Sequence, residues 1–351
     1  MKPPAFHCGY FPGAARLRRV PLVCYGGGGR RAGFTLLELL VAMAVLMLIL
    51  ALAFSAITQT SVVWQRSTRD LEAFQGARRA FENITRLVSQ ATLNTYWDYE
   101  FDNTGRAVRY RRNSDLHFYL SPAGVNGAPG TPDSGQALFF QAPYGRRSEP
   151  VLAQWTPELL NEIGFYVEFG SNASWLPAGL GGALRESHRY RLFQTVQPTE
   201  DFSVYSENGT GAGVPSWIST ANAYPIADNI IALVVLPGRS QPDEAQFGPL
   251  VTVPAYDSRA AADQPNQPVT AHQLPPFLQI AVLAIDERSA ARLTSGSQQP
   301  AVVVSALQDR FRLAADFRSD LAAVEQELIE QGINCRVFVT RVQLKESKWS
   351  E

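Results

Sequence analysis

FTLLELLVAMAVLMLILALAFSAI, residues 34–57, is the apolar stretch that decides the architecture of this chain. A run of about 24 residues is long enough to cross a bilayer as one helix. Arg30 and Arg31 precede it, and no basic residue follows until Arg66. Because cytoplasmic flanks carry the excess of arginine and lysine, this asymmetry orients the segment. It predicts a single-pass membrane protein with a cytoplasmic N-terminus and the bulk of the chain outside.

A single charge, Glu38, interrupts the apolar run near its start. A carboxylate in hydrocarbon costs roughly 2.5–3.5 kcal/mol on insertion scales, so such a residue is a candidate functional site. Gly33 stands immediately before the aromatic Phe34, ahead of the run. A secretory signal peptide would instead carry its cleavage site after the run, behind small residues. The alternative is an ordinary signal anchor in which Glu38 has no role.

The residues around this junction resemble the class III motif of type IV prepilins, which is carried here by Gly33, Phe34, Thr35, Leu36, Leu37 and Glu38. The resemblance implies that a prepilin peptidase cuts between Gly33 and Phe34 on the cytoplasmic side. It also implies N-methylation of Phe34 and retention of the apolar helix in the mature protein. Residues 1–33 would then be a leader peptide, in which Gly26–Gly29 serves as an unstructured spacer.

The resemblance also gives Glu38 a role in assembly. In the pilin family, helices leave the bilayer and pack in the core of a filament, where a buried carboxylate needs a partner. The partner implied here is the N-terminal ammonium of Phe34 on a neighbouring subunit. The competing interpretation is that Glu38 pairs only with the amine of its own chain. The resemblance further implies other pilins or pseudopilins, the inner membrane and its assembly platform as partners.

The helix is expected to continue beyond the membrane through residues 58–95. Apolar residues recur every three or four positions, at Leu71, Phe74, Ala77, Phe81, Ile84, Val88 and Ala91, opposite a charged face. This pattern predicts an amphipathic helix with one buried stripe. With the membrane half it makes roughly 60 residues, on the order of 90 Å if unbroken. Gly76 and the Thr58–Ser61 cluster are places where it could bend.

Residues 96–351 are predicted to form a β-rich periplasmic domain. Alternating and apolar runs predict strands at Trp97–Phe101, Ala107–Tyr110, Leu116–Leu120, Ala137–Gln141, Ile163–Phe169, Tyr190–Thr195, Tyr224–Leu236 and Leu274–Asp286, with a short helix around Pro157–Asn161. A helix over Ala306–Gln331, capped by Gly332, and a strand over Ile333–Leu344 complete the chain. We therefore expect an α+β, pilin-like fold. Its long N-terminal helix packs on an antiparallel sheet, with an extra C-terminal helix and strand.

Two finer resemblances concern the layout of this domain. The strand Tyr224–Leu236, the long polar loop Pro237–Gln273 and the proline-led strand Leu274–Asp286 resemble minor pseudopilins of the J type and minor pilins of the W type. The whole chain resembles Verru_Chthon cassette protein C, a prepilin-type family. That resemblance rests on the Trp97–Phe101 strand, the Asn113–Phe118 segment and the Ser347-Lys348-Trp349 ending.

Composition excludes some partners. The formal net charge is −1, from 31 lysines and arginines against 32 acidic residues. Because there is no global basic field, we predict no nucleic-acid partner. Cys8 and Cys24 lie in the expected leader, so the mature chain would keep only Cys335 and form no internal disulfide. Cys335 is expected to behave as a buried small hydrophobe.

The sequence contains no recognisable catalytic constellation. His117, His188 and His272 do not stand in an H-x-x-x-H or H-E-x-x-H spacing, and C-x-x-C, P-loop and G-x-S-x-G motifs are absent. We therefore predict no enzyme activity, no cofactor and no metal. Trp155, Trp175 and Trp217 lie in loop-like stretches and are expected to be exposed. The function predicted is a structural minor pilin or pseudopilin of a type IV pilus-like or type II secretion-like filament. The alternative is an adhesive or substrate-binding module that displays the loops Pro122–Gly135 and Pro237–Gln273.

Overall fold

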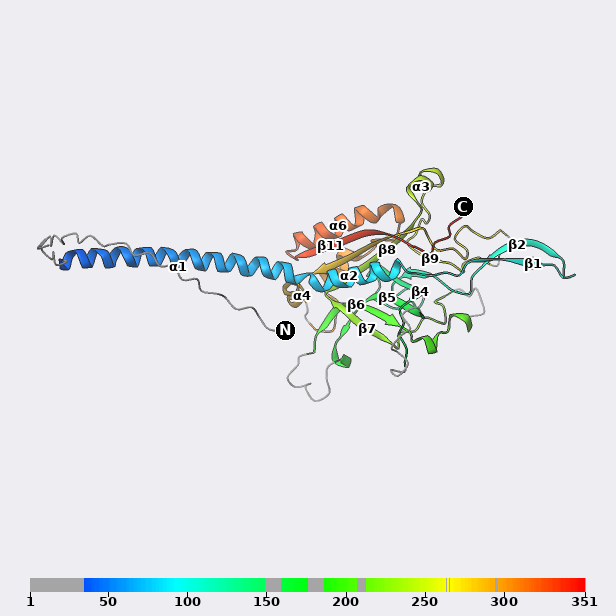
Figure 1. Ribbon diagram of the computed structural model, residues 1–351, viewed down its shortest axis with the longest axis horizontal. Coiled ribbons are helices and arrows are strands. Elements are labelled where there is room, and N and C mark those ends of the chain that lie inside the picture. Colours follow the sequence, from blue (N-terminus) through cyan, green and yellow to red (C-terminus); the bar gives the residue numbers. More distant parts are fainter. Residues whose placement is uncertain are drawn as a thin grey trace, which may run out of the picture. The chain divides into compact units, whose positions relative to one another are not determined.

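The computed structural model describes residues 35–148, 159–175, 186–206, 213–262, 264, 266–293 and 296–350. The chain divides into two compact units, Met1–Trp64 and Gln65–Glu351. The division falls within helix α1, which covers Leu36–Ala73 (Figure 1). Everything after α1 belongs to the second unit, whose architecture is described below.

The long helix expected over residues 34–95 is interrupted. Phe74 leaves the helical conformation, with φ −111° and ψ 7°, and the next helix, α2, covers Gln75–Val88. The break lies two residues before Gly76, one of the two places where the sequence predicted a bend. Apart from proline, glycine has the lowest helix propensity, so the chain gives up little helical stability by breaking beside it. The helix also stops at Val88, earlier than the apolar pattern suggested.

The predicted apolar stripe of α2 is buried. Ile84, Leu87 and Val88 are fully buried, while Arg78 and Glu82 form an ion pair on the exposed side. The buried side contacts β7 of one sheet and β10 and β11 of another. Helix α2 therefore lies between the two larger sheets and fills the centre of the core (Figure 1).

The larger sheet has six antiparallel strands in the order β7-β6-β5-β4-β3-β9. Their bounds are Tyr119–Pro122 (β3), Gln136–Pro143 (β4), Leu160–Ser171 (β5), His188–Val196 (β6), Ala223–Asp228 (β7) and Tyr256–Asp257 (β9). Short 3-10 turns follow β5 at Ala173–Trp175 and β6 at Thr199–Asp201 and Val204–Ser206. The predicted helix around Pro157–Asn161 is wrong at Leu160 and Asn161, which open β5; residues 157 and 158 lie outside the described part.

The second sheet has three antiparallel strands in the order β11-β10-β8. They cover Ile230–Gly238 (β8), Phe277–Ile285 (β10) and Cys335–Gln343 (β11). The sequence predicted one strand over Tyr224–Leu236, entered through a proline and an Asx turn; the structure has two strands, divided at Asn229, whose φ is 61°. A left-handed residue turns the chain, and asparagine tolerates that conformation better than most residues. As a result, β7 and β8 belong to different sheets.

The C-terminal helix predicted over Ala306–Gln331 is two helices, α5 over Ala301–Leu307 and α6 over Phe317–Glu330. Asp309 and Phe311 between them have positive φ, which no helix tolerates. The predicted cap is confirmed: Gly332 has φ 70°, and the N–H of Ile333 donates to the carbonyl of Leu328. Two shorter helices, α3 over Gln241–Phe247 and α4 over Glu287–Leu293, lie in the connections.

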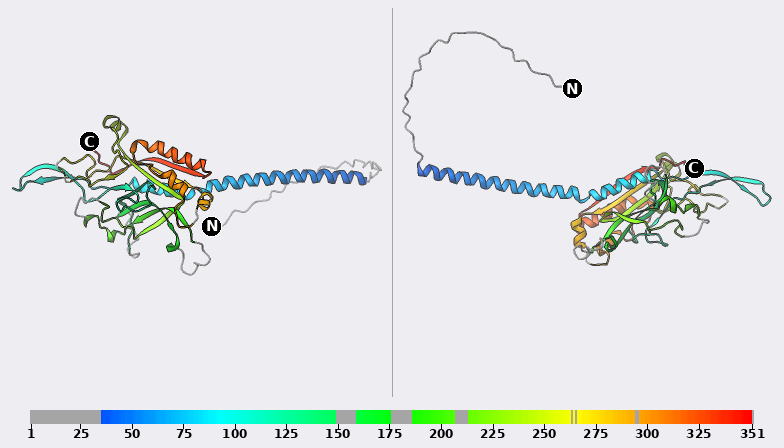
Figure 2. Two further views of the ribbon diagram at one scale, coloured as in Figure 1. Left: turned by 180° about the vertical axis from the view of Figure 1, so that it is seen from behind. Right: turned by 60° about the horizontal axis from the view of Figure 1, so that its bottom comes forward.

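Strands β1 and β2 form a separate two-stranded hairpin. They cover Tyr96–Phe101 and Ala107–Asn113 and pair antiparallel with a bulge at Glu100/Phe101. Asp102 shapes the turn, because its carboxylate accepts hydrogen bonds from the N–H groups of Thr104 and Arg106. Figures 1 and 2 show this hairpin projecting beyond the rest of the second unit.

The two loops expected to be displayed are tied into the core. In Pro122–Gly135, the carbonyl of the buried Ser134 accepts from the N–H of Leu233, which links this loop to β8. In Pro237–Gln273, Tyr256 pairs with β3 and is buried. Trp217 is also buried, against expectation, while Trp175 is exposed as predicted and Trp155 lies outside the described residues.

Candidate functional site

The N-terminal part of α1 has the properties of a membrane-crossing helix. Leu36–Ser55 has a mean hydropathy of 2.8 over 20 residues, and none of this window is buried. It is the one stretch among the described residues that is long and apolar enough to span a membrane. Large side chains such as Leu36, Leu37 and Met47 are more than half exposed. So much exposed apolar surface needs lipid or other protein to cover it.

Glu38 and Thr35 form a reciprocal pair at the start of this helix. The backbone N–H and the hydroxyl of Thr35 donate to Oε2 of Glu38, at 3.0 and 2.9 Å. In return, the N–H of Glu38 donates to the Thr35 hydroxyl oxygen at 3.3 Å. This is a capping box, with Thr35 as the N-cap and Glu38 three residues later. It supplies partners for helix-end N–H groups that have no acceptor inside the helix.

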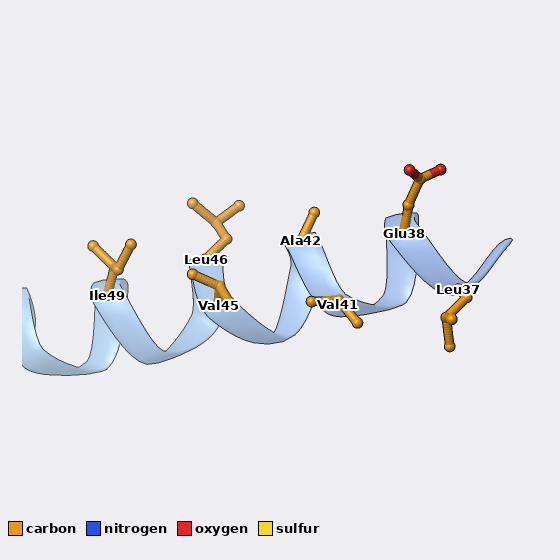
Figure 3. Close-up of a pocket in the computed structure, with 7 residues that line it drawn as sticks. All are labelled: Leu37, Glu38, Val41, Ala42, Val45, Leu46 and Ile49. Carbon is orange, nitrogen blue, oxygen red and sulfur yellow. The ribbon is translucent and has the colours of Figure 1, made fainter. Parts of the chain in front are cut away.

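The capping box gives the carboxylate an orientation. Figure 3 shows Glu38 directed away from the helix on the same side as Ala42 and Leu46. These side chains belong to a shallow hollow along α1 that is lined by Leu37, Glu38, Val41, Ala42, Val45, Leu46 and Ile49. Both Thr35 donors reach Oε2, so Oε1 receives neither of them. The Oε1 atom of Glu38, at the N-terminal end of this apolar face, is thus positioned to accept a hydrogen bond from a donor other than Thr35.

Of the residues that the sequence singled out, the structure places Glu38 in this site. Gly33, Phe34, Arg30 and Arg31 lie outside the described residues. Thr35 is the residue whose own role the sequence analysis missed, although it lies within the quoted motif. The signal was present, because a threonine three residues before a glutamate at the start of an apolar helix is the sequence signature of a capping box.

A second cluster, around His117, resembles part of a catalytic triad. Its hydrogen bonds leave no ring nitrogen for the role of a general base. The Nε2–H of His117 donates to Asp257 at 2.7 Å, and Nδ1 accepts from the indole N–H of Trp217 at 3.1 Å. Both ring nitrogens are therefore engaged, and His117 is 3% exposed. A general base needs a free nitrogen within reach of a substrate. Burial alone would raise the pKa of Asp257. The hydrogen bond and electrostatic effect of His117, together with the backbone N–H groups of Arg259 and Ala260, outweigh burial and hold that pKa below its ordinary value.

The described residues also bear on the expected metal, cysteine and histidine chemistry. Among these residues, no group of three or more histidine, cysteine or acidic side chains is placed to hold a metal ion. Cys335 is half-buried, not fully buried as expected, with its thiol beside the carbonyl of Glu325 at 3.7 Å. His117 and His272 are buried within the fold and His188 is half-buried.

Comparison with known proteins supports the N-terminal site. A family model described as the prokaryotic N-terminal methylation motif matches residues 29–54, which include Glu38 and most of the apolar part of α1. No curated protein and no solved structure matches the chain. The chain therefore carries the class III N-terminal signal of prepilin-like proteins, followed by a membrane-crossing helix and an α+β domain of pilin-like architecture.

Proposed function

We propose that this chain is a minor pilin or pseudopilin, a structural subunit of a type IV pilus-like or type II secretion-like filament. The observation that carries the proposal is the position of Glu38: a carboxylate at the head of an exposed apolar helix, inside the segment that matches the methylation motif. A lone carboxylate is costly in lipid and is retained where it has a functional partner. Pilin-like proteins are generally structural subunits, and we expect no enzyme activity here.

Processing is the first step of the proposed function. The methylation motif implies cleavage by a prepilin peptidase. We place the cut between Gly33 and Phe34, with methylation of the new Phe34 amine. Arg30 and Arg31 would keep this junction on the cytoplasmic face. The chain would then consist of a leader (1–33), a membrane segment (34–57), an amphipathic continuation (58–95) and a periplasmic domain (96–351).

Assembly would use the positioned carboxylate. In the membrane, Thr35 satisfies one oxygen of Glu38 within the same subunit. On entering a filament, the ammonium of Phe34 on a neighbouring subunit would pair with the other oxygen and set the axial register. A buried charge without its partner is strongly unfavourable, so a subunit packed in the wrong axial register would be destabilised. The partners proposed are other pilins or pseudopilins and the assembly platform of the inner membrane.

The layout of the second unit supports a finer relationship to J-type minor pseudopilins, W-type minor pilins and Verru_Chthon cassette protein C. The order of strand, long polar connection and proline-led strand on which this resemblance rests is the order of β8 and β10, which pair with each other. The aromatic strand β1 and the C-terminal strand β11 occupy the positions expected from the sequence. The size of the domain favours a minor subunit over one that repeats densely along a fibre.

A display role is the second candidate. The loops Pro122–Gly135 and Pro237–Gln273 support it weakly, because each holds buried residues that fix it to the sheets. The hairpin β1–β2 favours it more, since it projects from the domain and exposes aromatic side chains.

The deciding experiment is intact-mass analysis of membrane-extracted protein that has been co-expressed with a prepilin peptidase. The wild type should yield a mass that begins at methylated Phe34. Gly33→Ala should remain full length, whereas the matched control Gly29→Ala, four residues upstream, should be cut like the wild type. A full-length wild-type mass, or a cut after the apolar run near Ala56, would overturn the proposal.

A further inference from the structure

The hairpin β1–β2 has two chemically different faces. Side chains alternate along a strand, and the register pairs Trp97 with Arg112 and Tyr99 with Tyr110. One face, called here the aromatic face, therefore carries Trp97, Tyr99, Phe101, Val108, Tyr110 and Arg112. Trp97 is 63% exposed, Phe101 60% and Tyr110 63%. Exposed aromatic residues gathered on one face mark an interaction site more often than singly scattered ones do.

The opposite face is polar and self-contained. Glu100 and Arg109 form an ion pair across the strands, and the guanidinium of Arg111 donates to the carbonyl of Ala262. This face needs no further partner to satisfy its charges. Apart from Tyr96, whose hydroxyl donates to Asp115 on the opposite face, the aromatic side chains of the hairpin lie on the aromatic face, which the fold leaves uncovered.

The hairpin is held at its base so that the aromatic face keeps its shape. The side chain of Gln267 accepts from the N–H of Arg112 at 2.9 Å and donates to its carbonyl at 2.8 Å, like an added strand residue. A two-stranded hairpin alone is only marginally stable in water. Anchoring one end to the domain lets the projecting part stay ordered without a covering layer.

The rings on the aromatic face are arranged in advance of any ligand. The rings of Tyr99 and Tyr110 lie 4.6 Å apart, and their hydroxyls are hydrogen-bonded at 2.8 Å. The ring of Phe101 lies 6.2 Å from that of Tyr99. The guanidinium of Arg112 lies over the Trp97 ring, 6.0 Å from its centre. Such preorganisation lowers the entropy lost on binding.

We propose that the aromatic face binds a neutral polysaccharide, with pyranose rings stacked on Trp97, Tyr99, Phe101 and Tyr110. The axial C–H groups of a pyranose carry partial positive charge and meet the negative face of an aromatic ring. Tyrosine hydroxyls and the indole N–H at the ring edges can bond to sugar hydroxyls. A narrow ribbon with rings along its length fits a linear chain of sugars.

The charges on the hairpin indicate that the ligand is neutral. Recognition of sugar acids or phosphates relies on cations that are free to pair with them. The guanidinium of Arg112 is buried and donates to the carbonyl of Pro268 at 2.9 Å. Arg109 is engaged by Glu100 on the opposite face. Apart from Arg106, which is exposed at the turn, these arginines are engaged, and the aromatic face presents mainly π-surfaces and hydroxyl groups.

The size of the aromatic face argues against a stable protein partner. A specific protein interface usually involves about 20–30 residues a side and about 800 Å² per partner. Six side chains on one ribbon provide much less than that, whereas a few stacked sugars need no more. The inference deepens the display role in the proposed function, but binding itself does not require cleavage or filament assembly.

The test uses the full chain in a zwitterionic detergent without a sugar headgroup, so that the micelle does not compete. Retention on insoluble cellulose and chitin is measured by co-sedimentation, and binding of cellohexaose by calorimetry. Wild type should be retained on one of these polysaccharides. Trp97→Ala and Phe101→Ala should each weaken binding about tenfold, the loss expected for one stacked ring. Asp98→Asn, on the opposite face, should bind like the wild type, and all variants should keep the wild-type melting temperature.

Three results would overturn the proposal. The first is that the wild type is retained on neither polysaccharide. The second is that Trp97→Ala and Phe101→Ala bind as tightly as Asp98→Asn. The third is that these two variants instead lose association with phospholipid vesicles or with a second copy of the chain, which would assign the aromatic face to a membrane or to self-association. The mass analysis at Gly33 reports on processing separately, so the two proposals can fail independently.

Discussion

Thr35 and Glu38 satisfy each other at the first turn of α1, through hydrogen bonds in both directions. The proposed filament contact pairs the Glu38 carboxylate with a neighbouring subunit. One oxygen of this carboxylate already accepts hydrogen bonds from Thr35 of its own chain. This arrangement stabilises the helix start in the single subunit and leaves Oε1 to accept from outside. Helix capping and assembly would share one side chain.

The first prediction separates these two roles. Glutamine can replace glutamate in a capping box, so Glu38→Gln should keep the helix start intact, whereas Glu38→Ala and Thr35→Ala should loosen it. Loss of a cap costs about 1 kcal/mol, which corresponds to about fivefold faster amide exchange in the first turn. Hydrogen–deuterium exchange of the N-terminal peptide, measured by mass spectrometry in detergent, checks this. Equal exchange in all three variants would contradict the capping role.

The second prediction concerns Gly135, which joins the two larger sheets. A Cβ at this position would lie 1.9 Å from the carbonyl oxygen of Leu233, and the residue has φ +93°. Gly135→Ala must therefore move one sheet against the other, and we expect it to destabilise the domain by more than about 3 kcal/mol. Urea unfolding of the full chain in detergent, followed by circular dichroism, measures this loss.

Gly105 provides the matched control for Gly135. It also has positive φ, +80°, but a Cβ there would meet no atom within 4 Å. Gly105→Ala should cost only the backbone strain of a left-handed residue, about 1–2 kcal/mol. If both substitutions had the same effect, the close approach of Gly135 to Leu233 would not be what limits this position.

The third prediction concerns the buried pair of His117 and Trp217. Trp217→Phe keeps most of the ring but removes the N–H that donates to Nδ1 of His117. Because both residues are almost fully buried, water cannot easily replace this hydrogen bond. We expect a loss of about 1–3 kcal/mol in the free energy of unfolding. Trp175→Phe, at an exposed indole, is the control and should change it by less than about 0.5 kcal/mol.

The fourth prediction is a pH dependence from Asp257. Burial raises the pKa of this carboxyl, but His117 and the N–H groups of Arg259 and Ala260 together bring it below its ordinary value in the folded protein. A carboxyl whose pKa is depressed on folding stabilises the protein above its unfolded value, here 3.8, and loses that contribution as the pH falls through the folded value. The stability difference between wild type and Asp257→Asn should be constant from pH 7 to 5 and shrink below pH 4. A difference that grew on acidification would contradict this assignment.

The features that were predictable from sequence are those encoded by local pattern. The apolar run, the buried stripe of α2 and the Gly332 cap each follow from residue spacing or from one conformationally special residue. Glu38 could be singled out because a charge inside an apolar run is rare and costly. These elements lie where the sequence placed them.

The errors arose where one residue redirects the chain or where distant segments meet. The sequence indicates an Asx turn in the segment Tyr224–Leu236, but it does not show that the left-handed Asn229 sends β7 and β8 into different sheets. The residues Asp309 and Phe311 similarly split one helical pattern into α5 and α6. The loop-like neighbours of Trp217 predict an exposed side chain, whereas its partner His117 lies 100 residues away in the sequence. The two-faced character of the hairpin depended on register, which the strand pattern alone does not fix.

The last prediction uses Cys335 as a probe of the folded domain. Burial, and then the charge of Glu325, raise the pKa of this thiol to about 11. At pH 8 only about one thiol in a thousand would be ionised, against about one in four for an unperturbed cysteine. A thiolate of higher pKa is intrinsically more nucleophilic, which recovers part of this difference.

Iodoacetamide should therefore modify native Cys335 at pH 8 at least about tenfold more slowly than the urea-unfolded chain. The variant Cys8→Ser/Cys24→Ser removes the two N-terminal thiols, so that the measured rate belongs to Cys335 whether or not the leader has been cut. Cys335→Ser in this background is the blank. Because the thiol lies between β11 and the Glu325 carbonyl of α6, its protection reports the packing of that helix on the sheet. A native rate equal to the unfolded one would mean that α6 does not stay docked in solution.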